Sequence, residues 1–407
     1  MDAISRTPRV KIGAIHPLAV AWLTMFTVGA DLFVVSPLLP LIADDYAVAP
    51  ASAGFCVTMF AAAYMLSAPA LGHLADRIGR QRVLVWSLWA FAAANLLTAQ
   101  AGGFTWLLSA RCLAGAAAAG VSPSVYALAS GSAPPEQRAT WLAIVVSGLL
   151  MSLSFGAPIG LLTAGLFGWR IVFAGLGVLT LLLVWANSRL WHGRPAAGSR
   201  GAPAGRLPRA AVIASLAPTV LWSTALYAVY TYFGEGLGAV GFSTEEIARL
   251  ILFYGCGAIA GTLIGGRMAD RLGAQTASSI GLMGLCSGLL VAVVLLALNP
   301  GILVDCTFGL VSLLAQLFFP AQQLRLASEF PANRVALLAW NNSALFFGIS
   351  LGSLIGGQAV SLGGFRLDLA VAATIASAGF FANRRDGRSR IHSGFTRLHQ
   401  PFQAGVR

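Results

Sequence analysis

Two ionisable side chains lie deep inside long apolar stretches of the sequence. Asp31 lies in the apolar run from about residue 17 to 42, and Arg111 lies in another run at 105–129. A charge in hydrocarbon costs on the order of several kcal/mol unless it faces water, a substrate or an opposite charge. Burial favours the neutral form of an aspartic acid, whereas a neighbouring guanidinium favours the carboxylate. Together these two residue types can bind and release a proton.

The depths of Asp31 and Arg111 in their apolar runs are compatible with contact. Asp31 is about 14 residues into its run and Arg111 about 6 residues into a run that enters from the opposite side, with a rise of about 1.5 Å per helical residue. We expect Asp31 to carry the proton and Arg111 to be its partner, with loading and release as their separation changes. The alternative is a static ion pair that fixes helix packing.

A second concentration of charge, GHLADRIGRQR at 72–82, interrupts the apolar chain and recurs as GGRMADRLGAQ near residue 270. Glycines here leave room for a tight turn and close helix approach, an aspartate can cap the positive end of a helix, and arginines can pair with carboxylates. The residues of this expected gating loop are Gly72, Asp76, Arg77, Gly79, Arg80, Asp270, Arg271 and Gly273. The alternative is a plain turn whose arginines set membrane sidedness.

The composition identifies the elements that position these residues. Of 407 residues, 57% are hydrophobic and 10% are charged, whereas a soluble domain carries roughly 25% charged residues. A membrane span needs about 20 apolar residues. On that scale the sequence predicts twelve spans, at 18–41, 52–72, 83–101, 105–129, 140–165, 169–189, 210–233, 247–267, 276–298, 302–325, 335–360 and 366–383.

The basic residues are distributed unequally between the two sides of these spans. With both termini cytoplasmic, 22 of the 26 Lys and Arg residues lie on the cytoplasmic side, and only Arg170, Arg249 and Arg366 lie on the other. This bias follows the positive-inside rule and accounts for the net charge of +12 without a nucleic-acid partner. We therefore expect a multi-pass protein of the cell membrane, the bacterial inner membrane, with both termini cytoplasmic.

An internal repeat divides the chain in two. ADRIG at 75–79 recurs as ADRLG at 269–273, an offset of 194, and Gly156 and Gly160 recur as Gly352 and Gly356, an offset of 196. Repeated halves in the same orientation are typical of rocking transporters with a site between the halves. The predicted parts are an N-terminal tail at 1–17, a six-helix bundle at 18–189, a linker at 190–209, a second bundle at 210–383 and a basic tail at 384–407, expected to be poorly ordered.

These motifs resemble those of the major facilitator superfamily, and within it the twelve-span drug:proton antiporters and the arabinose or sugar-efflux permeases. The family's loop pattern G-x-L-a-D-r-x-G-r-k-x-x-l matches Gly72, Leu74, Ala75, Asp76, Arg77, Gly79, Arg80 and Leu84. The fourth-span pattern l-x-x-R-x-x-q-G matches Leu108, Arg111 and Gly115, with Ala114 in place of the usual glutamine. The resemblance implies an all-α membrane protein with twelve transmembrane helices in two six-helix repeats, the major facilitator fold.

The resemblance also implies a hinge and a central cavity. FGAPIGLLTAGLFGWR resembles the efflux permeases' G-x-P-x-G motif, so Gly156, Pro158 and Gly160 are the expected hinge, with small-residue packing as the alternative. The candidate cavity residues are Trp22, Tyr126, Tyr227, Tyr230, Gln316, Gln322 and Asn341. For each, an aromatic-belt position or an interhelical hydrogen bond is the alternative. The second half shows no mid-span charge, which favours an uncharged or amphipathic substrate.

Three classes of function remain. The motifs favour proton-coupled efflux of a small organic solute, such as a drug, sugar or nucleoside. An uptake symporter and a transport-inactive sensor are the alternatives. An enzyme is not expected, because the sequence shows no His/Cys metal cluster, nucleophile elbow or phosphate loop. The expected partners are the substrate, protons and the lipid bilayer, with no cofactor, no metal and no obligate protein partner.

Overall fold

The computed structural model describes residues 15–191, 208–298 and 302–398, and in these ranges every regular element is a helix. By length and composition, eleven of the described helical segments can cross a membrane. The chain divides into two compact units, the first comprising Met1–Val48 and Phe55–Arg200 and the second Ala49–Gly54 and Gly201–Arg407. The expected linker at 190–209 and the tail at 1–17 lie mostly outside the described residues.

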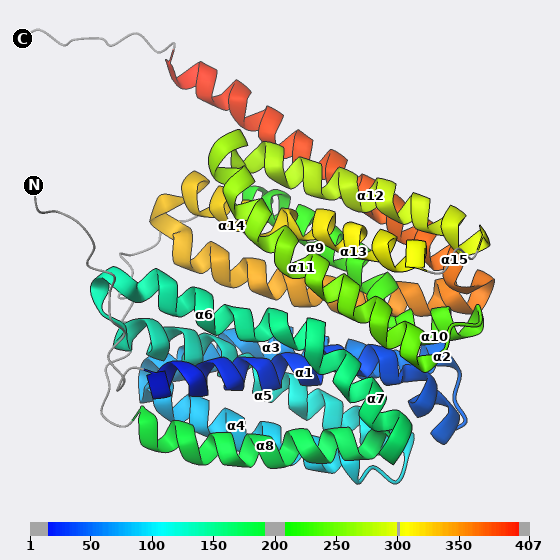
Figure 1. Cartoon of the computed structure of the whole chain (residues 1–407). Helices are drawn as coiled ribbons and strands as arrows, with labels where there is room; N and C mark the ends of the chain where they lie inside the picture. Colours follow the sequence, from blue (N-terminus) through cyan, green and yellow to red (C-terminus); the bar gives the residue numbers. More distant parts are fainter. Residues whose placement is uncertain (1–14, 192–207, 299–301, 399–407) are drawn as a thin grey trace, which may run out of the picture. The chain divides into compact units, whose positions relative to one another are not determined.

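The first unit contains six spans. Its elements are α1 (Ile15–Asp45), α3 (Phe55–Ile78), α4 (Arg80–Ala99), α5 (Phe104–Ser132), η2 (Pro135–Gln137), α6 (Arg138–Met151), η3 (Ser152–Gly156), α7 (Ala157–Phe167) and α8 (Trp169–Leu190) (Figure 1). The segment from η2 to α7 forms one span, Pro135–Phe167, that contains a π-helical turn at η3.

The second unit has a matching set of helices. Its elements are α2 (Pro50–Ala53), α9 (Arg209–Thr231), α10 (Phe233–Ala239), α11 (Thr244–Leu272), α12 (Ala274–Leu298), α13 (Ile302–Gln316), α14 (Phe318–Glu329), η4 (Pro331–Asn333) and α15 (Arg334–Leu398) (Figure 1). The backbone of α15 is not helical at Gly363 and Gly364. That kink separates the predicted eleventh and twelfth spans, so α15 holds two spans.

Local sequence signals explain where α11 begins and ends. At its start, Ser243 Oγ accepts the Glu246 N–H at 3.2 Å and Glu246 Oε2 accepts the Ser243 N–H at 2.9 Å, which is a reciprocal capping box. At its end, Gly273 has φ of 86°, and Gly79 takes the matching role between α3 and α4 with φ of 97°. A positive φ is free of strain only for glycine, so each repeat turns at a single residue.

Small residues bring the helices of each unit into close contact. A Cβ at Gly160 would lie 2.3 Å from Val34 Cγ2 of α1, and a Cβ at Gly356 would lie 2.6 Å from the Ala228 carbonyl oxygen of α9. Such small-residue contacts let membrane helices approach at backbone distance. The repeat therefore preserves the same close packing of α7 on α1 and of α15 on α9.

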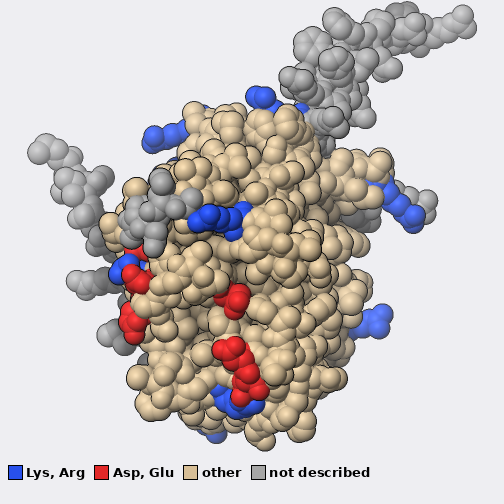
Figure 2. Space-filling model, turned by 90° about the vertical axis from the view of Figure 1, so that its right-hand side faces the viewer, with Lys and Arg blue, Asp and Glu red and all other residues tan. Residues whose placement is uncertain are grey.

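Large apolar side chains point away from both units. Leu166 is 78% exposed, Leu66 71% and Leu362 80%. Figure 2, which looks onto the ends of the helices, shows small groups of acidic and basic side chains there, whereas the exposed leucines form an apolar surface. In water such a surface would drive association, whereas in a bilayer the lipid chains cover it. The exposed side chains therefore fit a membrane-embedded protein.

Part of the basic tail expected at 384–407 is helical. The helix α15 continues from the last span as far as Leu398 (Figure 1). The sequence 384–398 contains no proline to end the helix. Residues 399–407 lie outside the described chain.

Candidate functional site

Asp31 of α1 and Arg111 of α5 form a bidentate ion pair in the first unit. Arg111 Nη1 donates to Asp31 Oδ1 at 2.7 Å, and Nη2 donates to Oδ2 at 3.0 Å. The side chains are 0% and 1% exposed. Two parallel charge-assisted hydrogen bonds fix both groups in one plane, and burial prevents water from competing for them. The structure thus brings together the two residues expected to exchange a proton.

Two aromatic rings enclose the guanidinium of this pair. The Arg111 Cζ lies 5.0 Å from the ring centroid of Phe60 on α3 and 5.3 Å from that of Phe173 on α8. Both rings are almost fully buried. Cation–π attraction stabilises the arginine and the rings keep water away from it. Four helices, α1, α3, α5 and α8, therefore build the site, although the sequence indicated only the two charged partners.

Glycine positions set the distances between these four helices. A Cβ at Gly115, one turn after Arg111, would lie 2.0 Å from the Phe60 carbonyl oxygen. Without a side chain there, α5 approaches α3 closely enough for the guanidinium to meet the Phe60 ring. The fourth-span motif therefore supplies the arginine and also the space that its aromatic neighbour needs.

The expected hinge residues follow the π-helical turn. The segment Ser152–Gly156 is π-helical, and the Ala157 N–H donates to the Ser152 carbonyl. Pro158 has no N–H and stands at the start of α7, where none is required. A Cβ at Gly156 would lie 3.2 Å from the Ala30 Cβ, one residue before Asp31. The turn and the two glycines therefore lie against the part of α1 that carries the acid.

The loop motif takes a simpler form than expected. Arg80 donates to Asp76 at 2.8 Å within one helical turn, and the Asp76 side chain is 69% exposed. No side-chain hydrogen bond caps the start of α4 at Gly79. The expectation that Gly72 allows close helix approach was wrong, because a Cβ there would meet nothing within 4 Å. Asp270 and Arg271 are exposed in the second copy, next to the Gly273 turn.

Three of the seven candidate cavity residues make hydrogen bonds between helices. Trp22 Nε1 donates to Ser147 Oγ at 3.1 Å, Gln322 Nε2 donates to the Ser215 carbonyl at 2.8 Å, and Asn341 Oδ1 accepts from Thr219 at 2.6 Å. For these three residues the structure thus shows the interhelical hydrogen bond that the sequence left open as the alternative to lining a cavity. The other four differ in burial: Tyr230 is buried, and Tyr126, Tyr227 and Gln316 are half-buried.

Comparison with known proteins assigns the family. Residues 21–244, more than half of the chain, match the family model described as Major Facilitator Superfamily. The chain belongs to this superfamily. An uncharacterized MFS-type transporter of Bacillus subtilis, YceJ, is 30% identical over 343 residues, which cover 82% of this chain and 86% of that protein. A chloramphenicol resistance protein of Streptomyces lividans is 28% identical over 272 residues, 65% of this chain and 69% of that protein.

A solved structure shares the fold of this superfamily member. It is a bacterial homolog of the human lysosomal transporter Spinster in an inward-facing, unoccupied conformation, with a TM-score of 0.73 and 17% identity over 92% of this chain and 98% of that one. The superfamily and the all-α membrane fold predicted from the sequence are therefore confirmed. Membership makes the chain a multi-pass membrane protein of a family of secondary transporters.

The second unit of this superfamily member contains buried charges that the sequence reading overlooked. Asp305 of α13 and Asp368 of α15 are both 0% exposed, and Arg249 Nε of α11 donates to Asp305 Oδ2 at 2.6 Å. The inference that this half lacks charge within its spans holds only for the span centres. Both acids stand near the start of a predicted span, where interface positions and buried positions look alike in sequence. An acidic residue within an apolar run was the available signal.

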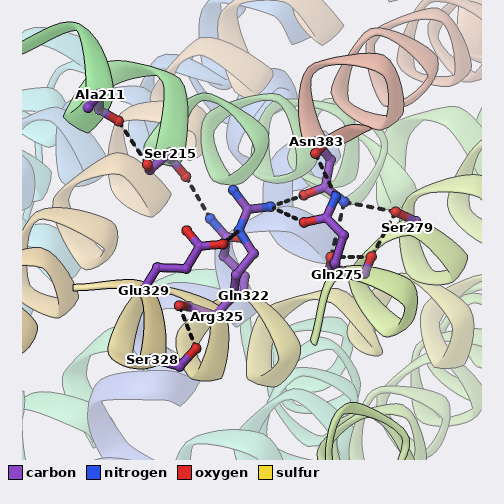
Figure 3. A network of polar contacts seen from close by, with 10 residues as sticks. Ala211, Ser215, Gln275, Ser279, Gln322, Arg325, Ser328, Glu329 and Asn383 are labelled. Carbon is purple, nitrogen blue, oxygen red and sulfur yellow. Dashed lines mark hydrogen bonds and ion pairs between the residues drawn. The ribbon is translucent and has the colours of Figure 1, made fainter. Parts of the chain in front are cut away.

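Arg325 of α14 forms a polar cluster with residues of two other helices. Figure 3 shows its guanidinium directed at the Gln275 and Asn383 side chains, from α12 and α15. Arg325 Nη1 donates to Gln275 Oε1 at 3.0 Å and to Asn383 Oδ1, and Nε pairs with Glu329 at 3.4 Å. Arg325 is only 2% exposed, although the sequence suggested a basic residue at the membrane surface. The cluster ties three helices of the second unit together.

A third charged cluster lies where α1 ends in the first unit. Arg170 pairs with Asp45, and its Nη2 donates to the Tyr46 hydroxyl at 3.2 Å and to the Ala101 carbonyl at 3.1 Å. The Tyr46 hydroxyl itself donates to the Ala101 carbonyl at 2.6 Å. Burial raises the pKa of Tyr46 above its ordinary value, although Arg170 opposes the shift. The phenol accepts from Arg170 and donates to the Ala101 carbonyl, so it joins the end of α1 to the start of α8 and to the connection between α4 and α5.

Proposed function

We propose that the protein is a proton-coupled secondary transporter that exports a small organic solute by alternating access. The observation that carries this proposal is the buried, bidentate Asp31–Arg111 pair between α1 and α5. The similarity to a chloramphenicol resistance protein supports export of a small amphipathic molecule. The bias of basic residues supports cytoplasmic termini in a bacterial inner membrane.

The pair supplies a coupling step through its own chemistry. With Arg111 in contact, two charge-assisted hydrogen bonds stabilise the Asp31 carboxylate. When α1 and α5 separate, each charge loses its partner, and breaking a buried pair by removing one partner costs about 3–5 kcal/mol. Protonation of Asp31 removes that cost on the acid, while water meets the freed guanidinium, and substrate binding favours the paired, deprotonated state. Return of the helices expels the proton.

Other parts of the first unit allow the two helices to separate. The π-helical turn Ser152–Gly156 packs against α1 near Asp31 and ends just before Pro158, so α1 and α7 adjoin where the helix is least regular. We assign Gly156, Pro158 and Gly160 to a hinge there. The loop with the Asp76–Arg80 pair acts as a gate that favours one access state, and its second copy at Asp270, Arg271 and Gly273 acts with it.

Transport in everted membrane vesicles tests this function, with chloramphenicol as the first probe. We expect accumulation driven by an acidic interior, and its collapse by a protonophore. Asp31→Asn abolishes gradient-driven accumulation but retains exchange of labelled for unlabelled probe. In Asp31→Asn the buried Arg111 guanidinium has no counter-charge, which lowers expression. The double variant Asp31→Asn/Arg111→Gln removes that charge as well, and we expect it to restore expression but not coupling.

The same assay separates the alternatives. Accumulation only with the opposite gradient would identify an uptake symporter. Wild-type accumulation by Asp31→Asn would show that the pair is a static element of helix packing. If chloramphenicol fails, a panel of uncharged and amphipathic drugs, sugars and nucleosides is tested under the same gradient.

A further inference from the structure

Asp368 is buried in a membrane-spanning helix of the second unit. It lies in α15, four residues after Gly364, where the kink ends and the last span begins. Its side chain is 0% exposed. Nothing in the Asp31–Arg111 mechanism uses this acid, because it belongs to the other unit.

Both carboxyl oxygens of Asp368 lack a hydrogen-bond donor among the described residues. In the part of the chain that the structure describes, no ion pair includes the Asp368 carboxyl. Asp305 of the adjoining α13 is paired with Arg249. The other titratable side chains on elements packed against α15 are Arg209, Tyr227 and Tyr230 of α9, Glu235 of α10, Cys286 of α12, and Arg325 and Glu329 of α14.

A carboxylate in these surroundings would be an isolated buried charge. An isolated ion in a low-dielectric interior takes or gives up a proton rather than bearing the full desolvation cost. The carboxyl therefore stands in its neutral form in this conformation. Even a neutral acid is unfavourable there, since its oxygens have no partner in the described chain.

The repeat shows that the fold does not need an acid at this point. In the first unit the residue four positions after Gly168, the matching positive-φ glycine, is Val172. Val172 packs apolar atoms beside Gly160, with its Cγ1 3.5 Å from the position that a Gly160 Cβ would take. An apolar side chain serves the same place in the same backbone, so the carboxyl at Asp368 has a role other than packing.

Aromatic side chains shield this region of the second unit. Phe365, one turn before Asp368 on α15, contacts Phe233 with ring centroids 6.1 Å apart and stacks with Phe308 at 6.5 Å. Residues three apart on a helix share a face, so Asp368 lies beside this cluster. The rings come from α10, α13 and α15, and movement of any of these helices would open the cluster to water.

We infer that Asp368 is a second proton-binding site, which holds a proton on its carboxyl in the conformation seen here and releases it to water when the aromatic cluster opens. The inference rests on the proposed function only in its use of alternating access. The step forms and breaks one O–H bond and needs no other reactant. Its proton would add to the one carried by Asp31.

Infrared spectroscopy of the full-length protein in liposomes tests the inference. At neutral pH the wild type is expected to show the carbonyl band of a buried, weakly hydrogen-bonded carboxylic acid. The band disappears in Asp368→Asn, remains in Asp31→Asn, and decreases reversibly as the pH is raised. No difference between wild type and Asp368→Asn, or a band that stays constant until the protein unfolds, would overturn the inference.

A second variant separates a proton site from a structural acid. Asp368→Val places the residue of the first unit in the second unit, and we expect an unfolding temperature equal to or above that of the wild type. A lower unfolding temperature would mean that the carboxyl is needed for packing and would contradict the inference. If Asp31→Asn still shows gradient-driven transport, the proposed function fails. The infrared result at Asp368 does not depend on that outcome.

Discussion

The two units share a backbone pattern but differ in their buried charges. Gly156 and Gly160 of the first unit match Gly352 and Gly356 of the second, and both sets pack against the first helix of their unit. By contrast, Asp31 corresponds to Ala225 at the offset of 194 that relates the loop motifs of the two halves. The repeat has therefore kept the contacts that hold helices together and changed the residues that can hold charge.

The position of Arg111 shows the difference most clearly. At the offset of 194 it corresponds to Asp305, and Gly115 corresponds to Gly309. Arg111 is fully buried and bidentate, whereas Asp305 uses one oxygen to bind Arg249, whose side chain is 43% exposed. The closed pair and the half-open pair thus share one equivalent helix, α5 and α13, but their partner helices differ, α1 in the first unit and α11 in the second. The fully enclosed, bidentate ion pair therefore belongs to the first unit.

The largest expected effect is that of Arg111→Gln. Loss of the arginine leaves Asp31 buried without its partner, and we expect a loss of about 3–5 kcal/mol in unfolding free energy, together with loss of coupled transport. Chemical denaturation in detergent measures the first effect. Arg111→Lys is the matched control, since it keeps the charge but loses bidentate geometry, and it should fall between the wild type and Arg111→Gln.

A smaller effect is expected at the Arg249–Asp305 pair of the second unit. Arg249→Gln leaves Asp305 unpaired, but water reaches the partly exposed arginine position, so we expect a loss of about 1–3 kcal/mol in unfolding free energy. Gradient-driven transport should persist. If Arg249→Gln abolished coupling as Arg111→Gln does, the asymmetry between the units would be wrong.

The packing glycines provide a test of similar size. A Val at Gly160 would overlap Val34 of α1, and overpacking of this kind costs about 1–3 kcal/mol. Gly356→Val should cost a comparable amount in the second unit. Gly72→Ala is the control, because its Cβ would meet nothing, and it should leave the unfolding curve unchanged. Equal sensitivity at Gly72 would contradict the close-packing account.

The smallest effect on stability is expected at the loop. Asp76→Asn removes an exposed ion pair within one helical turn, which contributes about 0.3–0.5 kcal/mol. If the loop is a gate, transport rate nevertheless falls while stability hardly changes. The matched change in the second copy, Asp270→Asn, should lower the rate less, because Ala274 stands four residues after Asp270, where Arg80 follows Asp76 in the first copy. Unchanged rates in both would leave only a role in sidedness.

The sequence predicted the spans and the matching depths of Asp31 and Arg111, because both depend on position along a single helix, whereas their contact also requires that α1 and α5 adjoin. The depth of a residue in its span follows from its residue number, because each helical residue adds a fixed rise. A charge in the middle of a span is stable only beside water, a substrate or an opposite charge. The sequence did not predict Phe60 and Phe173 as neighbours of Arg111, because this depends on how four helices rotate against one another. Ordinary aromatic residues in apolar runs give no signal of such a contact.

The misplaced residues have a common cause. Asp305, Asp368 and Arg325 lie near the ends of spans, where hydropathy indicates a polar interface, yet all three are buried against neighbouring helices. The loop glycine Gly72 was assigned to close packing from its motif alone, and the structure places open space beside it. Burial at a span end depends on tertiary contacts that a count along one chain does not contain.

Proton release on substrate binding tests the central claim most directly. Purified protein in weakly buffered detergent solution receives chloramphenicol, or the substrate found in vesicles, while a pH indicator records released protons. The proposed mechanism predicts release by the wild type, none by Asp31→Asn, and none by Asp31→Asn/Arg111→Gln although both variants bind the probe. Undiminished proton release by Asp31→Asn would contradict the assignment of Asp31 as the proton carrier.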